Sequence, residues 1–468
     1  PYGIPSSVFD PDYISGGSSS GSAVAVASGL AAFSLGTDTA GSGRVPAGFN
    51  NIVGLKPTKG LLSARGVIPA CRTQDTVSIF ALTTADAARV LDIAAGYDAE
   101  DSYSRTAPRP RVYEPLSNGL RVGVPAEPLE FFGDSECERL YGLAVERLRE
   151  LGCEIVPFDF KAFREAADLL YSGPWVAERL AAIKDFASIK PDSIHEVVRG
   201  IILGAEKISA VQTFEGMYRL AELVRRAEVE WAKVDTLILP TSPTTYKISE
   251  VLADPIRLNS NLGLYTNFVN LMDLSALAVP AGFRQNGLPA GVTIMGRAFA
   301  DAQLAVLGDA LHRTLAESRL GATSMPLSAT PAIATTPPKL IQVAVVGAHL
   351  TGQPLNSQLI ERSARFVRTT RTASGYSFYA LANTTPAKPG LVYDGKGAGN
   401  IEVEVWEMDD AAFGSFVALI PAPLGIGTIK LADGSSVKGF VCEPHATRDA
   451  ENITHTGGWR KWLSVRRA

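Results

Sequence analysis

Two short turns near the start of the chain combine glycines with serines, the residue types that place an attacking hydroxyl beside unhindered backbone N–H groups. The first turn reads GGSSSGS at residues 16–22, and the second reads GTDTAGSGRVP at residues 36–46. A stretch rich in alanine and valine separates them at residues 23–32. One helix over that stretch would bring the two turns, and therefore two serine hydroxyls, together.

Other glycine-rich motifs fit these turns poorly. Residues 17–21 satisfy G-x-S-x-G, the nucleophile elbow of α/β-hydrolases, but that elbow follows a hydrophobic strand. Residues 10–14 read DPDYI, which is no such strand, and no downstream histidine has a supporting context. A phosphate-binding loop needs a lysine after its glycines, and a dinucleotide-binding fold needs G-x-G-x-x-G. Neither pattern is present, and a Gly-rich turn around a buried helix with no catalytic role is a further alternative.

The second turn has the composition of an oxyanion hole. The small residues leading to Ser42 leave successive backbone N–H groups free to converge on one oxygen. Ser42, at the end of the turn, is then placed to attack a carbonyl carbon held there. We expect the Asp38 side chain to orient the turn and Arg44 to pair with it. A contact between Arg44 and a substrate carboxylate is the alternative.

These turns, together with VGLKPT at residues 53–58, resemble the amidase signature family. The resemblance implies a Ser–cis-Ser–Lys triad, with Ser42 as the nucleophile and Ser18 as the bridging serine whose peptide bond is cis. It also implies that the oxyanion hole consists of the N–H groups of Thr39, Ala40, Gly41 and Ser42. In such a relay a neutral lysine accepts the proton of the bridging serine, which accepts that of the nucleophile; the relay then protonates the departing amine.

The lysine of this triad has no counterpart in the sequence. Members of the family carry it several tens of residues before the bridging serine, whereas only seventeen residues precede Ser18 and none is a lysine. The first lysine, Lys56, matches the GLKPT segment instead. We therefore expect the chain to be an N-terminally shortened form of the enzyme, inactive as written.

Charge and cysteine content exclude several functional classes. The formal net charge is −4, with both signs mixed along the chain, which gives no electrostatic footprint for nucleic acid or an anionic membrane. No apolar run approaches the ~18 residues that span a bilayer. The four cysteines and five histidines show no metal-ligand spacing. We expect no metal, no cofactor and a cytoplasmic location; the family resemblance implies a small-molecule substrate and a homodimer.

The chain divides at an uncharged stretch rich in proline, threonine and alanine. We expect an α/β domain at residues 1–321, an extended linker at 322–339 and a smaller domain at 340–468. The first should hold a mixed central sheet covered by helices, and the second should be a β-rich α+β fold. The strands expected in the first domain are 120–124, 236–240 and 290–295, and its helices are 136–151, 160–171, 175–187, 212–233 and 301–317.

The second domain is expected to hold short strands joined by tight turns. The predicted strands are 341–347, 399–406, 413–419, 427–431 and 437–442, with Asp433-Gly434 in a hairpin turn. The segments VVGAHLTGQPLN (345–356), EVEVW (402–406), PLGIGT (423–428) and GFVCE (439–443) resemble the C-terminal domain of allophanate hydrolases.

That second resemblance implies a γ-glutamyl-cyclotransferase-like barrel, although no acidic residue after Glu404 matches the catalytic residue of the cyclotransferases. It also implies a reaction. The amidase domain would release ammonia from allophanate (urea-1-carboxylate), and the product, N-carboxycarbamate, would then break down to carbon dioxide and ammonia. The sequence leaves open whether allophanate comes from urea or from triazine rings such as cyanuric acid.

Allophanate carries a carboxylate, so its pocket needs a fixed cation. The resemblance to allophanate hydrolases assigns substrate binding to a tyrosine and an arginine eight residues apart, a spacing that Tyr171 and Arg179 share. Pro174 suits the first turn of a helix, which would carry Arg179 and leave Tyr171 just before it. Arginine offers a planar, bidentate fork for a carboxylate. An ordinary ion pair of Arg179 with Glu178 or Asp185 is the alternative.

A proton-transfer step in the second domain would use a histidine most readily. His349, at the end of the first predicted strand, and His455 are the candidates, and a purely structural role is the alternative for both.

Two other functions compete with allophanate hydrolysis. One is a different amidase of the signature family, such as the glutaminase subunit of a tRNA-dependent amidotransferase, and the other is a non-catalytic binding protein.

Overall fold

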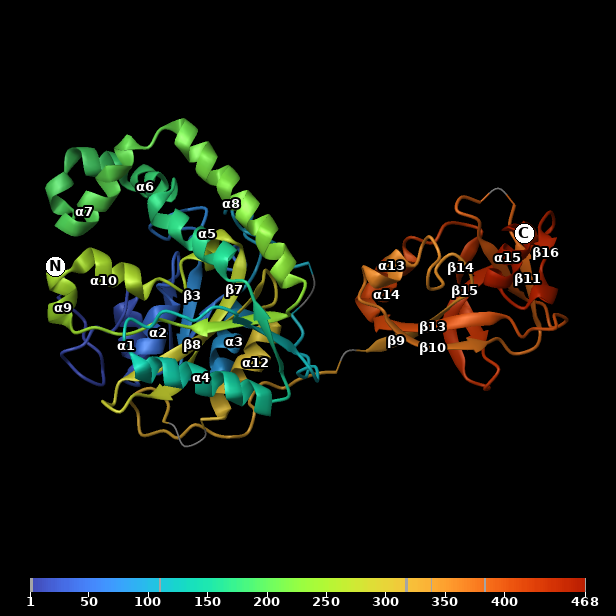
Figure 1. The fold of residues 1–468 in the computed structure, drawn as a ribbon, viewed down its shortest axis with the longest axis horizontal. Coiled ribbons are helices and arrows are strands. Elements are labelled where there is room, and N and C mark those ends of the chain that lie inside the picture. Colours follow the sequence, from blue (N-terminus) through green and yellow to red (C-terminus); the bar gives the residue numbers. More distant parts are fainter. Residues whose placement is uncertain (1–2, 109–110, 316–318, 338, 383, 468) are drawn as a thin grey trace. The chain divides into compact units, whose positions relative to one another are not determined.

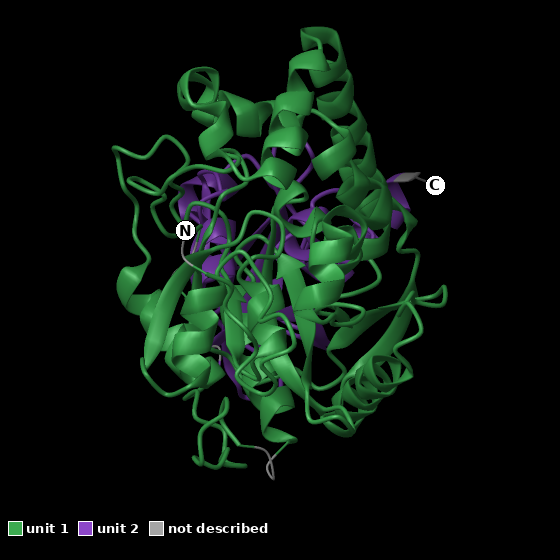
Figure 2. Ribbon diagram, turned by 90° about the vertical axis from the view of Figure 1, so that its left-hand side faces the viewer, with its two compact units in different colours: residues 1–336 green, residues 337–468 purple. Residues whose placement is uncertain are grey.

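The chain folds into two compact units, shown in different colours in Figure 2. The structure is a computed structural model and describes residues 3–108, 111–315, 319–337, 339–382 and 384–467. The first unit runs from Pro1 to Thr336 and the second from Pro337 to Ala468. Each unit has its own hydrophobic core.

The described part of the first unit is built on one mixed sheet (Figure 1). Its strand order is β1-β3-β2-β7-β8-β6-β4-β5. Strand β4 is parallel to both of its neighbours, and the remaining pairs are antiparallel. The strands are β1 (Phe33–Thr37), β2 (Val53–Lys56), β3 (Val77–Ala81), β4 (Arg121–Pro125), β5 (Glu154–Phe158), β6 (Thr236–Pro240), β7 (Leu274–Phe283) and β8 (Pro289–Arg297).

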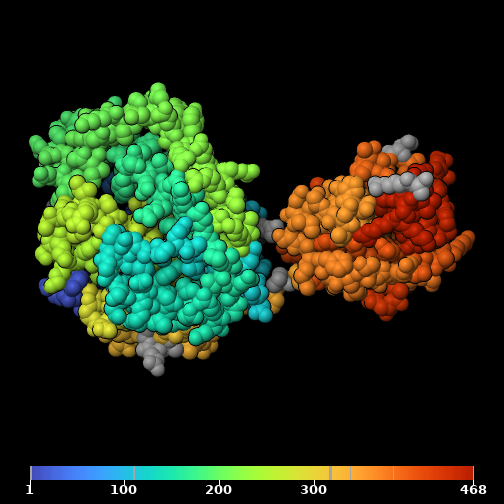
Figure 3. All heavy atoms as spheres, in the orientation of Figure 1, coloured from blue at the N-terminus to red at the C-terminus, as the bar shows by residue number. Residues whose placement is uncertain are grey.

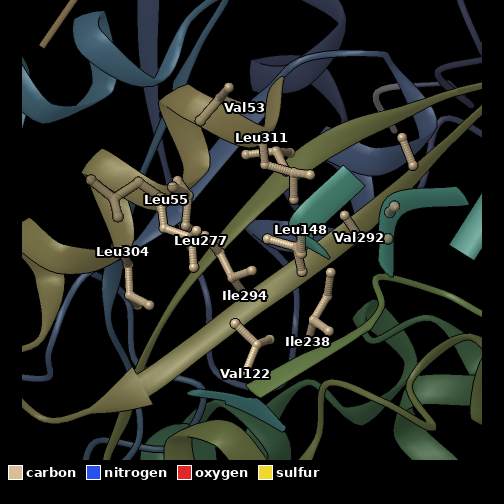
Figure 4. Packing of buried hydrophobic residues seen from close by; sticks show 14 of the residues in the cluster. Val53, Leu55, Val122, Leu148, Ile238, Leu277, Val292, Ile294, Leu304 and Leu311 are labelled. Atoms are coloured by element: carbon tan, nitrogen blue, oxygen red, sulfur yellow. The ribbon is translucent and has the colours of Figure 1, made fainter. Parts of the chain in front are cut away.

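Helices cover both faces of this sheet because successive side chains of its central strands point to opposite sides. On β7, Leu277 and Val279 join the core formed with α3 (Thr84–Ala94), α4 (Ser135–Glu150) and α12 (Asp301–Arg313), part of which Figure 4 shows. Leu274 and Ala276 join the core on the other face. That core includes α5 (Lys161–Ser172), α8 (Ala210–Trp231) and α11 (Phe268–Leu271).

Two short helices, α1 (Ser20–Ala27) and α2 (Arg44–Phe49), follow the two serine-containing turns. Ala23, Val26 and Ala47 pack with Phe80 of β3 and Ala278 of β7. The sheet therefore supports both turns through the helices that follow them.

A lobe of helices stands at the edge of the first unit, drawn in green in Figures 1 and 3. It consists of α6 (Trp175–Ile189), α7 (Glu196–Leu203) and α8. None of the side chains of α7 is buried, and α6 buries only Trp175, Val176 and Ala187. The first turn of α6 is thus the main point at which this helix is anchored. Two further helices are α9 (Ile248–Ala253) and α10 (Pro255–Leu262).

The second unit holds two antiparallel-rich sheets in its described residues, with orders β10-β13-β9-β15-β14 and β12-β11-β16. The strands are β9 (Leu340–Val345), β10 (Arg365–Arg371), β11 (Tyr376–Ala380), β12 (Pro389–Tyr393), β13 (Glu402–Asp409), β14 (Leu424–Lys430), β15 (Ser436–Cys442) and β16 (Glu451–Asn452). The helices are α13 (Ser357–Ile360), α14 (Asp410–Val417) and α15 (Trp459–Arg467). The predicted α/β fold with a β-rich second domain is confirmed.

Most of the predicted elements are confirmed with shifts of a few residues at their ends. The hairpin predicted at Asp433-Gly434 joins β14 to β15, and Gly434 has the positive φ (83°) that such a turn requires. The helix predicted at 301–317 ends at Arg313, and residues 316 and 317 of that prediction lie outside the described residues.

The strand predicted at residues 413–419 is wrong, because these residues lie mostly in helix α14. The Asp409 side chain caps that helix by accepting a hydrogen bond from the backbone N–H of Ala412 at 2.6 Å. Phe413 and Phe416 then lie three residues apart, on the face that packs on the core. An N-cap signal and helical spacing were present, but the aromatic and β-branched residues favoured a strand.

Most of the stretch predicted as a linker, 322–339, is grouped with the first unit, which continues to Thr336. The backbone of this stretch is bonded to the first unit at several places. Ala322 donates to the carbonyl oxygen of Ala27 at 2.8 Å, Ala332 to the Asp309 carboxylate at 2.9 Å, and Thr336 to the carbonyl oxygen of Tyr113 at 2.8 Å. Proline-rich composition predicted an extended chain but not the surface on which it lies.

No helix within the described ranges combines the length and apolar character needed to cross a lipid bilayer.

Candidate active site

The turn that carries Ser18 lies against helix α2, which begins two residues after Ser42. A Cβ atom on Gly16, whose φ is +76°, would lie 2.9 Å from the Cα of Pro46, so only glycine allows this approach. Asn50 joins the same two segments, since its Nδ2 donates to the carbonyl oxygens of Ser15 at 2.9 Å and Pro46 at 2.8 Å. The two predicted serine turns therefore meet in the fold.

Ser18 and Ser42 differ in their surroundings. The Gly17–Ser18 peptide bond is cis, as the family resemblance implies. The Ser18 residue is exposed, whereas Ser42 is half-buried.

A fully buried ion pair holds the second turn. The Asp38 carboxylate accepts hydrogen bonds from the backbone N–H groups of Gly41 (2.9 Å) and Gly43 (3.1 Å), and from Nε and Nη2 of Arg44 (both 2.9 Å). Neither side chain is exposed to solvent. Burial by itself would raise the pKa of Asp38, but the Arg44 guanidinium and these hydrogen bonds hold that pKa below its ordinary value. The predicted pairing is confirmed, and Arg44 is not available to a substrate.

The backbone of the turn leaves three N–H groups open. Gly41 donates to Asp38, whereas the N–H groups of Thr39, Ala40 and Ser42 donate to no group within the described residues. The N–H of Gly41 is therefore not free to donate to a substrate oxygen. The N–H groups of Thr39, Ala40 and Ser42 remain as candidates for the oxyanion hole. Gly41 has φ +127°, and a Cβ atom there would lie 2.3 Å from Oγ1 of Thr266. The turn thus requires glycine at this position for its conformation and its packing.

Two residues more than two hundred positions away complete this network. Thr266 donates from Oγ1 to the carbonyl oxygen of Ala40 at 2.7 Å. Asn270 donates from Nδ2 to the carbonyl oxygens of Asp38 at 2.6 Å and Gln74 at 2.9 Å, and its Oδ1 faces Nη2 of Arg44 at 3.4 Å. The sequence marks Asn270 only as a possible cleft residue and does not predict these contacts, since no local pattern identifies the distant turn against which a polar side chain will be buried.

Loop 70–75 connects the turn to the lobe. Asp75 accepts the hydroxyl hydrogen bond of Thr39 at 2.5 Å. Cys71 packs in a small apolar cluster with Trp175 of α6, and Ala40 of the turn packs against the same cluster. Asp75 is a further residue that no sequence pattern had marked.

Tyr171 and Arg179 occupy the positions that were predicted for them. Helix α5 ends at Ser172, so Tyr171 lies in its last turn, and α6 begins after Pro174 and carries Arg179. The Arg179 guanidinium lies over the Tyr171 ring, 5.0 Å from its centroid. Its Nε is buried and has no hydrogen-bond partner among the described residues. Across the described residues no ion pair links Arg179 to Glu178 or Asp185, because Glu178 instead binds Thr73.

The lysine in the GLKPT segment is buried beside the Asp38–Arg44 pair. Lys56 is completely inaccessible to solvent, and its Nζ donates to the carbonyl oxygen of Pro57 at 2.8 Å. Burial lowers its pKa to about 7; the Asp38 charge opposes this shift and the Arg44 charge adds to it. Burial raises the pKa of Cys71, in loop 70–75, to about 12. Its thiol therefore stays protonated near neutral pH and is a poor nucleophile.

The second unit contains a cavity of about 200 Å³ beside His349. Its lining also includes Gln358, Thr385, Lys388 and Phe440. His349 Nε2 lies 2.9 Å from Oε1 of Gln358, and the imidazole stacks on the Phe440 ring with centroids 4.9 Å apart. Burial lowers the pKa of His349, an effect that the hydrogen bond to Gln358 opposes.

The other candidates in the second unit lie elsewhere. His455 is exposed in a short helical turn, Thr454–Thr456, and is not among the residues that line this cavity. Glu404 is buried and accepts hydrogen bonds from Thr351, Trp406 and Arg460. These contacts hold the pKa of Glu404 below its ordinary value against the opposing effect of its burial. Glu404 is thus committed to a structural ion pair. The described residues contain no cluster of histidine, cysteine or acidic side chains that could hold a metal ion.

Comparison with protein families and curated proteins finds two similarities that follow one another along the chain. Residues 1–305 match the family described as Amidase, and residues 341–464 match the allophanate hydrolase C-terminal domain. The chain is 41% identical to the urea amidolyase of Saccharomyces cerevisiae over 99% of its own length, but spans only 26% of that protein. It is 35% identical to one component of the glutamyl-tRNA(Gln) amidotransferase of Acidobacterium capsulatum over 64% of its length, and spans 69% of that protein.

Solved structures give the same picture. The allophanate hydrolase of Kluyveromyces lactis is 40% identical with a TM-score of 0.71, and the similarity covers 99% of this chain and 78% of that one. The urea amidolyase of the same organism is 39% identical with a TM-score of 0.72, over 100% of this chain and 29% of that one. The chain therefore spans about a quarter of the length of the urea amidolyases, and its similarity to them extends over both units.

The buried lysine gives the first testable prediction. Between pH 7 and 10.5, Lys56 is mostly neutral in the folded protein but protonated in the unfolded chain. The free energy of unfolding should therefore rise with pH relative to that of a Lys56→Met variant, by about 1 kcal/mol per pH unit. Below pH 7 the two proteins should show a constant difference.

Urea unfolding at pH 7 and pH 9 measures this effect, with Lys190→Met as the control because Lys190 is exposed. If the difference in the free energy of unfolding between the wild type and Lys56→Met is the same at both pH values, Lys56 remains charged when buried.

Proposed function

Since the chain belongs to the amidase family, we propose that it hydrolyses allophanate through an acyl-enzyme on Ser42. The observation that carries this proposal is the position of Arg179. Its buried Nε has no hydrogen-bond partner among the described residues, and its helix contributes Trp175 to the cluster that contains Cys71 and contacts Ala40 of the second turn. A cation without an acidic partner in that part of the chain, on a helix packed near a hole for a developing oxyanion, suits a small amide that carries a carboxylate.

In the proposed reaction the Ser42 hydroxyl attacks the amide carbonyl carbon of allophanate. The N–H groups of Thr39, Ala40 and Ser42 stabilise the oxyanion that forms. Ser18 accepts the Ser42 proton and passes it along the relay to the lysine that the family resemblance implies several tens of residues before Ser18. The relay then returns a proton to the leaving amine, and ammonia departs. Water hydrolyses the acyl-enzyme to N-carboxycarbamate and regenerates Ser42.

Lys56 is a poor candidate for that lysine in spite of its lowered pKa. Its amine donates to the carbonyl oxygen of Pro57 and is completely buried, whereas the Ser18 residue that it would have to serve is exposed. We propose instead that Lys56 contributes to the electrostatic balance beneath the oxyanion turn, where its charge interacts with those of Asp38 and Arg44.

The glutaminase subunit of a tRNA-dependent amidotransferase is the competing proposal within the same family. Its support is the 35% identity to the Acidobacterium capsulatum protein, but that similarity extends over 64% of this chain. The match of residues 341–464 to the allophanate hydrolase C-terminal domain favours allophanate as the substrate. The similarity to urea amidolyases favours urea over triazine rings as its source.

We propose that the cavity beside His349 takes part in the second step, the breakdown of N-carboxycarbamate. Lys388 lines the cavity and can hold a carboxylate. His349, whose lowered pKa leaves the imidazole neutral near pH 7, can move a proton to or from the nitrogen or a water molecule. His455 is not among the residues that line this cavity and is the weaker candidate. The homodimer, which the family resemblance implies, and the cytoplasmic location, which the scattered cysteines indicate, remain proposals. Light scattering of the purified protein tests the first.

The first test of this function is Ser42→Ala in the full-length protein. Removal of the nucleophile should lower kcat for ammonia release from allophanate by about a thousandfold or more. Ser28→Ala is the matched control, since Ser28 is an exposed serine at the end of the neighbouring helix α1, and should retain activity. Ammonia release by Ser42→Ala at the wild-type rate would refute the assignment.

Arg179 gives the second test, which separates substrate recognition from chemistry. Loss of a charge-assisted, bidentate contact in Arg179→Ala should raise KM for allophanate about 10- to 100-fold, and Arg179→Lys should recover part of the loss. Lys184→Ala, an exposed cation on the same helix, should leave KM unchanged. Steady-state kinetics measure KM for allophanate in each variant. An unaltered KM in Arg179→Ala would remove this residue from the site.

His349 gives the third test. In full-length His349→Ala, the first equivalent of ammonia should appear at the wild-type rate and the second about tenfold or more slowly. His455→Ala should release both at the wild-type rate. Stopped-flow ammonia assays with parallel carbon dioxide detection measure the two phases. Two equivalents released together by His349→Ala would show that this cavity has no role in the second step.

A further inference from the structure

We infer that loop 70–75 couples binding of the substrate carboxylate at Arg179 to the geometry of the oxyanion hole, with Asp75 and Glu178 as positioning residues. This inference rests on the proposed function and goes beyond it, because neither residue belongs to the nucleophile, the relay or the hole. The contacts at the two ends of the loop support the coupling.

The first end of the loop holds the oxyanion turn. Asp75 Oδ1 accepts hydrogen bonds from Oγ1 of Thr39 at 2.5 Å and from the backbone N–H of Cys71 at 3.1 Å, and Oδ2 accepts one from the N–H of Ala70 at 2.9 Å. The carboxylate thus ties a side chain of the hole to the start of the loop. Since Thr39 contributes a free N–H to the hole, the rotation of its peptide unit depends on where Asp75 lies.

The second end holds helix α6 beside its arginine. The Glu178 carboxylate accepts hydrogen bonds from both the N–H and Oγ1 of Thr73, each at 2.8 Å. Cys71 Sγ donates to the carbonyl oxygen of Trp175 at 3.4 Å, and the same thiol interacts with the Arg179 guanidinium. Three contacts therefore link the first turn of α6 to a loop of six residues.

The loop between these ends is closed and rigid. The N–H groups of Gln74 and Asp75 both donate to the carbonyl oxygen of Cys71, at 2.8 and 2.7 Å. Lys59 crosses the turn, and its Nζ donates to the carbonyl oxygen of Thr73 at 3.2 Å and to Oε1 of Gln74 at 3.1 Å. A closed turn of this kind moves as one body, so a displacement at Thr73 also displaces Asp75.

The change that this loop would transmit is the ordering of helix α6 in the lobe. Because α6 and α7 bury few side chains, the helix that carries Arg179 depends on the contacts of its first turn for its position. A carboxylate bound by Arg179 would order that turn, and Glu178 would pass the constraint to loop 70–75. These contacts already hold the hole when no carboxylate is bound, and a carboxylate bound by Arg179 would strengthen them, so a substrate with a carboxylate should react faster at the chemical step than one without it.

The test compares Asp75→Asn and Glu178→Gln, singly and together, in the full-length protein. Two rates are measured, ammonia release from allophanate and the labelling of Ser42 by a small neutral fluorophosphonate. The label needs the nucleophile and the hole but has no carboxylate for Arg179. Asp98→Asn is the control, because Asp98 makes comparable hydrogen bonds to Ser63 and Glu100 in another loop.

If the loop couples the two sites, Glu178→Gln should slow both rates about tenfold, although Glu178 has no contact with the oxyanion turn. The double variant should be no more than about threefold slower than either single variant, because release of one end already disables the connection. Independent effects would multiply to about a hundredfold. Labelling at the wild-type rate in Glu178→Gln, or multiplicative effects, would overturn the inference.

Two further measurements distinguish failure of this inference from an unstable variant and from a wrong substrate. Thermal unfolding identifies a variant that is merely unstable, and Thr39→Val then replaces Asp75→Asn, since it removes the same hydrogen bond from the other side. If the wild-type protein is labelled at Ser42 but does not hydrolyse allophanate, the proposed substrate is wrong, while the labelling rates of the variants still decide whether the loop couples the two positions.

Discussion

Asp38 and Arg44 lie out of contact with water, where two isolated charges would be very unfavourable. Each oxygen of the carboxylate accepts one hydrogen bond from the guanidinium and one from a backbone N–H of the turn, so its charge is fully matched. Loss of either partner would leave an uncompensated buried charge, which costs about 3–5 kcal/mol. The turn that carries Ser42 surrounds this pair. The N–H groups of Gly41 and Gly43 donate to Asp38, whereas those of Thr39, Ala40 and Ser42 have no partner within the described residues.

The site is assembled from segments that are far apart in the chain. Thr266 and Asn270 hold the carbonyl oxygens of the turn from one side, and Asp75 holds Thr39 from another. None of these side chains is expected to touch a reacting atom. Their effect is to reduce the freedom of the backbone N–H groups, and a hole whose dipoles are already oriented need not reorganise as the oxyanion develops.

Predictions from the sequence succeeded where the interactions are local and failed where they are not. The pairing of Asp38 with Arg44 and the place of Arg179 on a helix after Pro174 were predictable, because each depends on residues a few positions apart. The role of Asn270 was not, since its partners are near residues 38 and 74. The error at α14 had a different cause, namely residues whose strand propensity competes with a helix cap at Asp409.

The amino-acid sequence by itself determined the family and the fold class, and it supplied the proposal for the two serines, because these depend on short patterns whose residue types leave few chemical alternatives. Tertiary structure decided which N–H groups of the turn remain open, that Nε of Arg179 is buried without a hydrogen-bond partner among the described residues, and that loop 70–75 contacts both the turn and helix α6. The physical reason is that a hydrogen bond or an ion pair is settled by distance in space, and the competing partners of a buried polar group come together only when the sheet and its helices have packed.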